Sequence, residues 1–234
     1  MITDHWPLTT DFMTWIKICG ITNLEDAQIA VEAGADALGF VFYEKSLRKI
    51  DVETAREIVR ELPRDIEKVG VFAGDSVGQW SDVAGSCDLT AVQVPLQGYA
   101  PARSDGELVA VSPWKPRKVY VVLPAAWLFE GRFSGGVPQP LDAIFLDSST
   151  LEHPGGTGKA FDWARAAPLL QNMSKSVKVV VAGGLTPGNV AQAMRILKPW
   201  GVDVASGVEA TPGKKDAEKV RAFIAAVRQE DKRS

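Results

Sequence analysis

The amino-acid sequence predicts an α/β fold, a single (β/α)₈ TIM barrel. Eight short apolar runs alternate with helical patterns along the chain of 234 residues. The runs are apolar throughout instead of alternating with polar residues, as expected for parallel strands that are covered on both faces. The length also fits a barrel of roughly 200–250 residues. An open, doubly wound sheet is the alternative that this pattern leaves open.

The expected strands are the eight apolar runs, taken in chain order. They are Trp15–Cys19, Leu38–Phe42, Lys68–Phe72, Leu89–Val94, Val119–Leu123, Ala143–Asp147, Val177–Ala182 and Val202–Ala205. No repeat at a solenoid period and no second domain is visible in the sequence. We therefore expect residues 15–229 to form one barrel domain, with residues 1–14 as an N-terminal extension and residues 230–234 as a C-terminal tail.

The expected helices follow most of these strands and carry recognisable termini. They cover Asn23–Gly34, Asp51 to about Pro63, Val77–Ala84, Phe161–Leu170, Thr186–Leu197 and Asp216–Arg228. Asn23 and Asp51 are favourable N-cap residues. Gly34 is a favourable stop, and Pro187 is favoured at the first position of a helix. After the fifth strand, the glycines and prolines of residues 124–140 predict an irregular segment in place of a regular helix.

Composition and charge narrow the class of protein. The formal net charge is −3, from 26 Lys and Arg against 29 Asp and Glu, which argues against a nucleic-acid partner. The two cysteines, Cys19 and Cys87, exclude a disulfide framework. The first residues lack the basic start and apolar core of a signal peptide, and no apolar run approaches the roughly 20 residues of a membrane helix. We therefore expect a cytoplasmic protein with no membrane partner.

Side chains that can carry chemistry gather where the expected strands end. Cys19 ends the first strand, and Arg48 follows the second. Asp147 ends the sixth strand, and Asp203 lies in the eighth. Taken singly, such a cysteine is usually a small buried apolar residue and such an aspartate a turn or cap residue. In a barrel, however, all of these ends meet at the mouth that holds the active site, so their convergence favours a functional role.

Two glycine-containing loops predict the class of ligand. Gly183 and Gly184 follow the seventh strand. Ser206 and Gly207 follow the eighth. Barrels bind phosphate at these two loops, because glycine lets backbone N–H groups approach the phosphate oxygens. Either loop alone could be a tight turn that needs positive φ, but the two together favour a phosphorylated small molecule as the ligand.

Several motifs occur in a fixed order along the chain. They are Lys17–Thr22, Gly39–Phe42, Lys45–Arg48, Val69–Phe72, Leu146–Asp147, Gly155–Lys159, Phe161–Trp163, Ala182–Leu185, Asn189–Val190, Val202–Glu209 and Pro212–Asp216. In this order they resemble the motifs of the phosphoribosylanthranilate isomerase family of tryptophan biosynthesis. The resemblance covers roughly residues 15–229.

The resemblance implies an Amadori rearrangement, in which an aminoaldose phosphate becomes an aminoketose phosphate. A general acid protonates the furanose ring oxygen, the ring opens to a Schiff base, and a general base removes the proton from C2′. Carried over by position, Asp147 would be the acid and Cys19 the base. A thiol is an effective base at neutral pH if nearby positive charge lowers its pKa, so we expect such a charge beside Cys19.

The resemblance also implies how the substrate is held. Arg48 would bind the anthranilate carboxylate, and Asp203 would help to hold the anthranilate side. The residues that would hold the phosphate are Gly183, Gly184, Ser206 and Gly207. No metal or organic cofactor is implied, and no cluster of histidine and cysteine in the sequence predicts a metal site.

The chain departs from the family after the fourth strand, where the family usually has Gln-Leu-His-Gly. Residues Gln93–Gly98 contain a proline here and no histidine, while both expected catalytic positions are retained. Two alternatives remain open. One is the related isomerase of histidine biosynthesis, although that enzyme uses an aspartate pair and this chain has Cys19. The other is a barrel that binds a phosphorylated ligand without catalysis.

Overall fold

A computed structural model describes residues 13–73, 77–96, 118–132, 141–148 and 160–233. Four of the sequence-based expectations concern residues outside these ranges. They are most of the N-terminal extension, the end of the loop that follows the fourth strand, the second part of the irregular segment 124–140, and the glycine-rich motif Gly155–Lys159.

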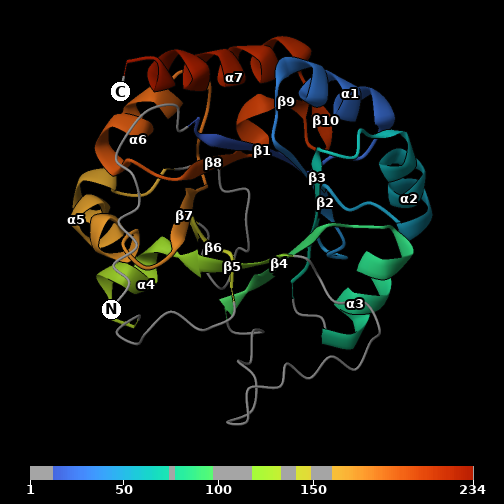
Figure 1. The fold of residues 1–234 in the computed structure, drawn as a ribbon, viewed down its shortest axis with the longest axis horizontal. Helices are drawn as coiled ribbons and strands as arrows, with labels where there is room; N and C mark the ends of the chain where they lie inside the picture. Colours follow the sequence, from blue (N-terminus) through green and yellow to red (C-terminus); the bar gives the residue numbers. More distant parts are fainter. Residues whose placement is uncertain (1–12, 74–76, 97–117, 133–140, 149–159, 234) are drawn as a thin grey trace, which may run out of the picture.

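Eight parallel strands close into a barrel in chain order, as predicted (Figure 1). They are β1 (Trp15–Cys19), β2 (Ala37–Val41), β3 (Glu67–Val71), β4 (Ala91–Pro95), β5 (Lys118–Pro124), β6 (Ala143–Asp147), β7 (Lys178–Val181) and β8 (Gly201–Val204). The pairing of β8 with β1 closes the ring and sets Lys17 opposite Asp203. This closure excludes the open, doubly wound sheet.

Helices surround the barrel (Figure 1). They are α1 (Leu24–Ala33), α2 (Val52–Glu61), α3 (Val77–Ser86), α4 (Ala125–Phe129), α5 (Trp163–Met173), α6 (Val190–Leu197) and α7 (Ala217–Asp231). Asn23 and Asp51 cap α1 and α2 as predicted, because each side chain accepts a hydrogen bond from a first-turn N–H. Within the described ranges, no helix has both the length and the apolar character needed to cross a membrane.

Two segments correct the details of the helix prediction. Helix α6 begins at Val190 and not at Thr186, because Asn189 bonds back to the preceding loop. Its Oδ1 accepts from the Thr186 N–H at 2.7 Å, and its Nδ2 donates to the Gly184 carbonyl at 2.9 Å. These bonds hold the residues before α6 as a separate turn. The segment after β5, which the sequence predicts to be irregular, starts with the five-residue helix α4.

The two ends of the barrel domain also differ from the expected boundaries. Helix α7 continues to Asp231, so the expected end at Gln229 comes too early. Thr14, assigned to the extension, is buried, and its hydroxyl donates to Asp231 Oδ1 at 2.5 Å. Arg228 joins the same region by donating to the Thr14 carbonyl and to Asp36 Oδ2. These polar contacts between distant residues leave no mark in the apolar periodicity.

A small hairpin follows β8 that the sequence does not predict. One turn of 3₁₀ helix, η2 (Ser206–Val208), leads into β9 (Glu209–Thr211), which pairs antiparallel with β10 (Lys214–Lys215). Its strands are short and mostly polar, so no apolar run marks them. The Thr22 hydroxyl donates to the Gly213 carbonyl and thereby ties the hairpin to the loop after β1.

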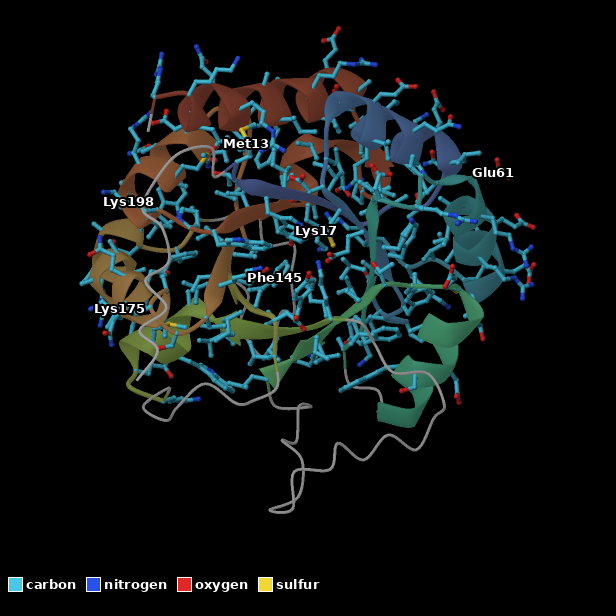
Figure 2. The ribbon with its side chains drawn as sticks, in the orientation of Figure 1. Met13, Lys17, Glu61, Phe145, Lys175 and Lys198 are labelled. Carbon is cyan, nitrogen blue, oxygen red and sulfur yellow. The ribbon has the colours of Figure 1, made fainter. Side chains whose placement is uncertain are left out.

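The apolar core consists of two clusters, one outside the ring of strands and one inside it. The larger lies between strands and helices, and the smaller fills the interior with Ala37, Val69, Ala91, Tyr120, Ala143, Phe145 and Val180. Figure 2 shows Lys17 and Phe145 within the ring of strands. Side chains alternate along a strand, and residues paired in register share a face. The polar residues that this alternation places inside, toward the carboxyl ends, are Lys17, Cys19, Gln93, Asp147 and Asp203.

Candidate active site

The carboxyl ends of the strands bring most of the predicted site residues together. A cavity of about 40 Å³ lies there, lined by Asp147, Gly183, Gly184, Leu185, Asp203, Val204, Ala205 and Ser206. Five of these eight residues are among the predicted site residues. Cys19 and Arg48 are not in its walls and come from β1 and from the loop after β2. The structure thus joins two carboxylates and both glycine loops at one mouth.

A buried ion pair crosses from β1 to β8 beside this cavity. Lys17 Nζ lies 2.9 Å from Asp203 Oδ1, and the two side chains are 0% and 9% exposed. The β1–β8 register places these residues directly opposite each other. Burying either charge alone would be costly, so each requires the other. Asp203 is therefore both a wall of the cavity and one half of this pair.

Cys19 lies next to this pair. It follows Lys17 by two residues on the same face of β1, and it is buried. Its neighbour in register on β2 is Gly39. A Cβ at Gly39 would lie 2.7 Å from Cys19 Sγ and 3.0 Å from Lys17 Nζ. The absence of that Cβ leaves one space that the thiol and the ammonium share.

The pKa of Cys19 depends on burial as well as on the expected positive charge. Burial raises the pKa of the thiol, the Lys17 ammonium lowers it to a smaller extent, and Asp203 adds to the rise. A positive charge is present beside the thiol, but it does not lower the pKa of Cys19 below the ordinary value, because desolvation outweighs it. Burial also lowers the pKa of Lys17, whereas Asp203 and Cys19 together outweigh burial and leave that pKa raised. Lys17 is therefore an ammonium at neutral pH, and Cys19 is mainly a thiol.

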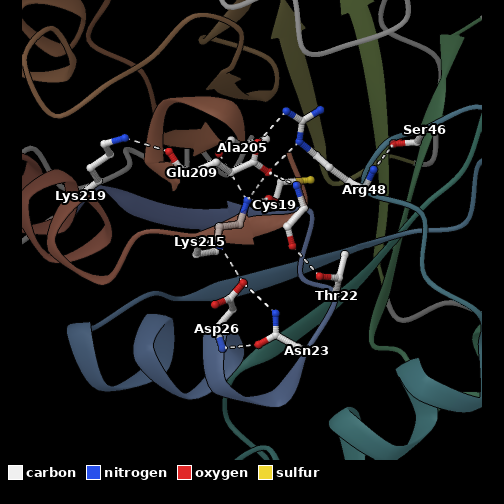
Figure 3. A network of polar contacts seen from close by, with 11 residues as sticks. Cys19, Thr22, Asn23, Asp26, Ser46, Arg48, Ala205, Glu209, Lys215 and Lys219 are labelled. Atoms are coloured by element: carbon white, nitrogen blue, oxygen red, sulfur yellow. Dashed lines mark hydrogen bonds and ion pairs between the residues drawn. The ribbon is translucent and has the colours of Figure 1, made fainter. Parts of the chain in front are cut away.

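Arg48 is held by a carboxylate from the hairpin (Figure 3). Its Nε and Nη2 donate to Glu209 Oε1 and Oε2, both at 2.8 Å, in a bidentate pair. The arginine side chain crosses Gly20, where a Cβ would lie 2.6 Å from Arg48 Cδ. The guanidinium is consequently fixed in position, and its Nη1 is not used by Glu209.

Lys215 connects this pair to the barrel strands (Figure 3). Its buried Nζ donates to the carbonyls of Cys19 at 2.6 Å and Ala205 at 3.3 Å, and to Glu209 Oε1 at 3.0 Å. Burial lowers the pKa of Lys215, and Glu209 opposes that change. Burial raises the pKa of Glu209, but Arg48 and Lys215 outweigh it and leave that pKa lowered. The network therefore keeps Glu209 ionised and ties the hairpin to β1 and to the end of β8.

The two glycine loops, residues 183–184 after β7 and 206–207 after β8, are called the phosphate loops below. Gly183 and Gly184 have φ of 78° and 67°, a region that other residues rarely adopt. A Cβ at Gly207 would lie 1.8 Å from the Leu185 carbonyl oxygen, so the loops meet through glycine. Within the described part of the chain, the N–H groups of residues 183, 184 and 206 donate to no backbone carbonyl. They are therefore available to anionic oxygens.

Gln93 is a further polar residue in the barrel interior. It is 7% exposed, and its Oε1 has no hydrogen-bond partner among the described residues. An unpaired buried acceptor costs on the order of 1–3 kcal/mol, and a hydroxyl or amine of a ligand would satisfy it. Pro95, the unusual residue of this segment, ends β4 and pairs in register with Val122 of β5. The proline is thus accommodated within the strand.

Four residues of this site have no role in the sequence-based prediction, namely Lys17, Gln93, Glu209 and Lys215. The first two could have been found from the sequence, since each is a polar residue inside an otherwise apolar strand. No apolar run gives such a signal for the other two, because the hairpin is mostly polar and its partners are distant in the sequence. Glu209 and Arg48, for example, are separated by 161 positions.

Comparison with known proteins identifies relatives over most of the chain. The family model for N-(5′-phosphoribosyl)anthranilate (PRA) isomerase matches residues 16–98 and 138–226. The N-(5′-phosphoribosyl)anthranilate isomerase of Geobacter sp. (strain M21) is 45% identical over 213 residues, which are 91% of this chain and 97% of that protein. The enzyme of the same name from Thermotoga maritima is 41% identical over 212 residues, with 91% and 97% covered.

Solved structures show the same relationship. The crystal structure of phosphoribosyl anthranilate isomerase from Thermotoga maritima matches with a TM-score of 0.74 and 38% identity, over 93% of this chain and 100% of that chain. A structure of such an isomerase with reduced 1-(o-carboxyphenylamino)-1-deoxyribulose 5-phosphate matches with a TM-score of 0.71 and 36% identity, at the same coverage. With its closed barrel and its mouth of carboxylates and glycine loops, the chain belongs to the N-(5′-phosphoribosyl)anthranilate isomerase family.

Proposed function

We propose that this chain catalyses the Amadori rearrangement of N-(5′-phosphoribosyl)anthranilate to 1-(2-carboxyphenylamino)-1-deoxyribulose 5-phosphate, a step of tryptophan biosynthesis. The observation that supports this most is that Asp147 lines the same cavity as Asp203 and both phosphate loops. A phosphate bound at those loops brings the attached sugar against a carboxylate. The relative solved with a reduced carboxyphenylamino-deoxyribulose phosphate holds a ligand of this class.

Asp147 acts first, as the general acid. In its protonated form it donates its proton to the furanose ring oxygen while the C1′–O bond breaks, and the nitrogen lone pair forms the Schiff base. Asp147 is the last residue of β6, its side chain is half-buried, and it lines the cavity. The carboxylate that remains is stabilised by the positive charge of the iminium.

Cys19 acts second, as the general base. Its thiolate removes the proton from C2′, and the electron pair of that C–H bond neutralises the iminium to give an enolamine. The enolamine becomes the ketone when C1′ gains a proton and the C2′ hydroxyl loses one. Because burial raises the pKa of this thiol, the rate depends on the groups that stabilise the thiolate.

The two ends of the substrate are bound by different elements. The N–H groups of the phosphate loops bind the phosphate, and no broad basic surface is needed. The Nη1 of Arg48, which Glu209 does not use, binds the anthranilate carboxylate, while Glu209 holds the other edge of the guanidinium. Asp203 contacts the anthranilate side of the substrate from β8, and Gln93 accepts a hydrogen bond from a substrate hydroxyl or amine.

The Glu209→Gln variant tests the placement of Arg48. The amide keeps the shape of the side chain, but it presents one donor to the guanidinium and leaves Lys215 buried without a counter-ion. Removing one partner of a buried ion pair costs roughly 3–5 kcal/mol of stability, and we expect KM to rise about tenfold or more with a smaller change in kcat. Steady-state kinetics and thermal denaturation measure the two effects.

The matched control is Glu44→Gln, on the same side of the molecule. Glu44 pairs with Lys49, but the two side chains are 80% and 40% exposed, so the pair contributes at most about 1 kcal/mol. This variant should keep the KM and stability of the parent protein. A Glu209→Gln protein with unchanged KM would contradict the proposed role of Glu209 in holding Arg48.

The proposed activity itself is tested with N-(5′-phosphoribosyl)anthranilate, whose fluorescence is lost when it reacts. Purified protein should consume it, and Cys19→Ala should lose nearly all of this activity. Absence of turnover with continued binding of the substrate would favour the non-catalytic barrel. Complementation of a histidine auxotroph would favour the isomerase of histidine biosynthesis, against which the thiol at the end of β1 argues.

We further propose that the enzyme works in the cytoplasm. Cys19 and Cys87 are both free, buried thiols. A thiol that serves as a base must stay reduced, and reducing compartments maintain this state. Burial raises the pKa of Cys87 to about 11, so this second thiol stays protonated at neutral pH.

A further inference from the structure

Lys17 is a buried charged residue that the mechanism above does not use. It is fully buried in the barrel interior, and its Nζ lies over the ring of Phe145 at 5.3 Å from the centroid. A lysine in such a place loses its hydration, and only specific partners compensate for that loss. The described partners are the carboxylate of Asp203 at 2.9 Å and the thiol of Cys19 beside it.

We propose that Lys17 is a positioning residue for the proton transfer, with its ammonium shared between Asp203 and the Cys19 thiolate. In this arrangement Lys17 favours loss of the thiol proton, and Asp203 opposes it by competing for the same ammonium. The proposal rests on the proposed function of Cys19 as the base. It gives Asp203 a second effect, on the acidity of the thiol, besides its contact with the substrate.

The register of three strands creates this arrangement. Lys17 and Cys19 occupy alternate positions of β1, so both side chains enter the interior. On one side β8 supplies Asp203, directly opposite Lys17. On the other side β2 supplies Gly39, directly opposite Cys19, where any Cβ would occupy the space next to both Sγ and Nζ. The ammonium therefore has an anion on one side and the thiol on the other.

The charge balance of the three groups explains why the arrangement favours reaction. With Cys19 as a thiol, Lys17 and Asp203 form a neutral buried pair. When Cys19 loses its proton, the thiolate gains an ammonium that is already desolvated and already in place, so little rearrangement is needed. A water molecule or a flexible surface lysine would first have to be ordered.

Other charged groups face Cys19 less directly. Lys215 on β10 approaches through the Cys19 carbonyl, and it shares the single carboxylate of Glu209 with Arg48. Its ammonium also lowers the pKa of the thiol, but less than that of Lys17 does. Asp147 enters from β6, which β7 and β8 separate from β1 around the barrel. Lys17 and Asp203 are therefore the pair whose alteration should change the acidity of the thiol most.

The proposal predicts shifts of opposite sign for two variants. In Lys17→Met the thiolate loses its ammonium, so the pKa of Cys19 should rise by about one unit or more, which lowers the thiolate fraction at neutral pH about tenfold. In Asp203→Asn the competing anion is gone, so the pKa of Cys19 should fall. Lys17→Arg keeps the charge and should restore a value near that of the parent protein.

The experiment measures the thiol directly, without substrate. The full chain with Cys87→Ala leaves Cys19 as the one thiol, and its ultraviolet thiolate absorbance and its rate of alkylation by iodoacetamide are followed against pH. The Cys19→Ala, Cys87→Ala protein supplies the background signal, and circular dichroism checks the fold of each variant. The pH profile of kcat/KM for each variant is then compared with the thiol titration.

A higher pKa of Cys19 in Lys17→Met together with a lower pKa of Cys19 in Asp203→Asn supports the proposal. An unchanged or lower pKa of Cys19 in Lys17→Met overturns it, as does an unchanged or higher one in Asp203→Asn. If Lys17→Met fails to fold, the pKa of Cys19 is compared in Asp203→Asn and Lys17→Arg. The proposal then requires a lower pKa in Asp203→Asn and a pKa near that of the parent protein in Lys17→Arg. Since the titration needs no catalysis, its failure is distinguishable from failure of the proposed function, which appears as turnover that survives Cys19→Ala.

Discussion

The Asp147→Asn variant is expected to lose turnover by roughly 10²–10⁴-fold in kcat while it keeps its fold and binds the substrate, the range that a lost general acid produces. Asparagine has the same shape as aspartate, but it has no acidic proton for the furanose oxygen. The ring then opens only by the uncatalysed route. The phosphate loops and Arg48 are untouched, so KM should change little. Stopped-flow and steady-state fluorescence with N-(5′-phosphoribosyl)anthranilate measure both constants.

A matched control for this variant lies on the same strand. Asp142 directly precedes β6 at the opposite end of the barrel, where its Oδ2 accepts a hydrogen bond from the Val119 N–H at 2.7 Å. In Asp142→Asn the amide oxygen can still accept this bond, and the site is remote, so activity should match the parent protein. Retention of more than about one tenth of kcat in Asp147→Asn would contradict the assignment of Asp147 as the acid.

The Gly207→Ala variant is expected to damage phosphate binding and stability together. The new methyl group would lie 1.8 Å from the Leu185 carbonyl oxygen and 2.9 Å from its carbon, so backbone must move. Overpacking of this kind costs typically about 1–3 kcal/mol, and here it forces the two phosphate loops apart. We expect KM to rise at least about tenfold, because each displaced N–H donor weakens a charge-assisted hydrogen bond to the phosphate.

Gly188→Ala provides the comparison for this loop variant. Gly188 lies in the turn after the first phosphate loop, but the nearest atom to its added Cβ is Thr186 Oγ1 at 3.8 Å, an ordinary contact. It should therefore leave the melting temperature and KM close to those of the parent protein. Isothermal titration with inorganic phosphate separates loop binding from the rest of the substrate. A Gly207→Ala protein that binds phosphate normally would show that the loops do not hold it.

Local features of the sequence are sufficient to predict most of the fold. The apolar runs become strands because both of their faces are covered, and caps such as Asn23 form because a side chain bonds an N–H within three residues. The prediction is wrong at the start of α6, where the Asn189 side chain bonds backward to the loop and so competes with the helix. It also misses the hairpin, whose polar strands are held by buried charges.

The candidate site also has a part that the sequence predicts and a part that it does not. The positions of Cys19, Asp147 and Asp203 are predictable because the carboxyl ends of all strands meet in any (β/α)₈ barrel. The protonation state of Cys19 is not predictable from the sequence, since desolvation depends on how many atoms pack around the thiol. The sequence also leads one to expect positive charge beside it without indicating that Lys17, two residues earlier, supplies it.

The sequence by itself determined the number and order of the strands and the family to which the chain belongs. It also determined that the candidate catalytic residues lie at the carboxyl ends of the strands. Only the tertiary structure decided which charges are paired. Lys17 meets Asp203 across 186 positions because β8 closes on β1 in one particular register. Ion pairing and desolvation vary steeply with distance and burial, and both quantities exist only once the barrel has closed.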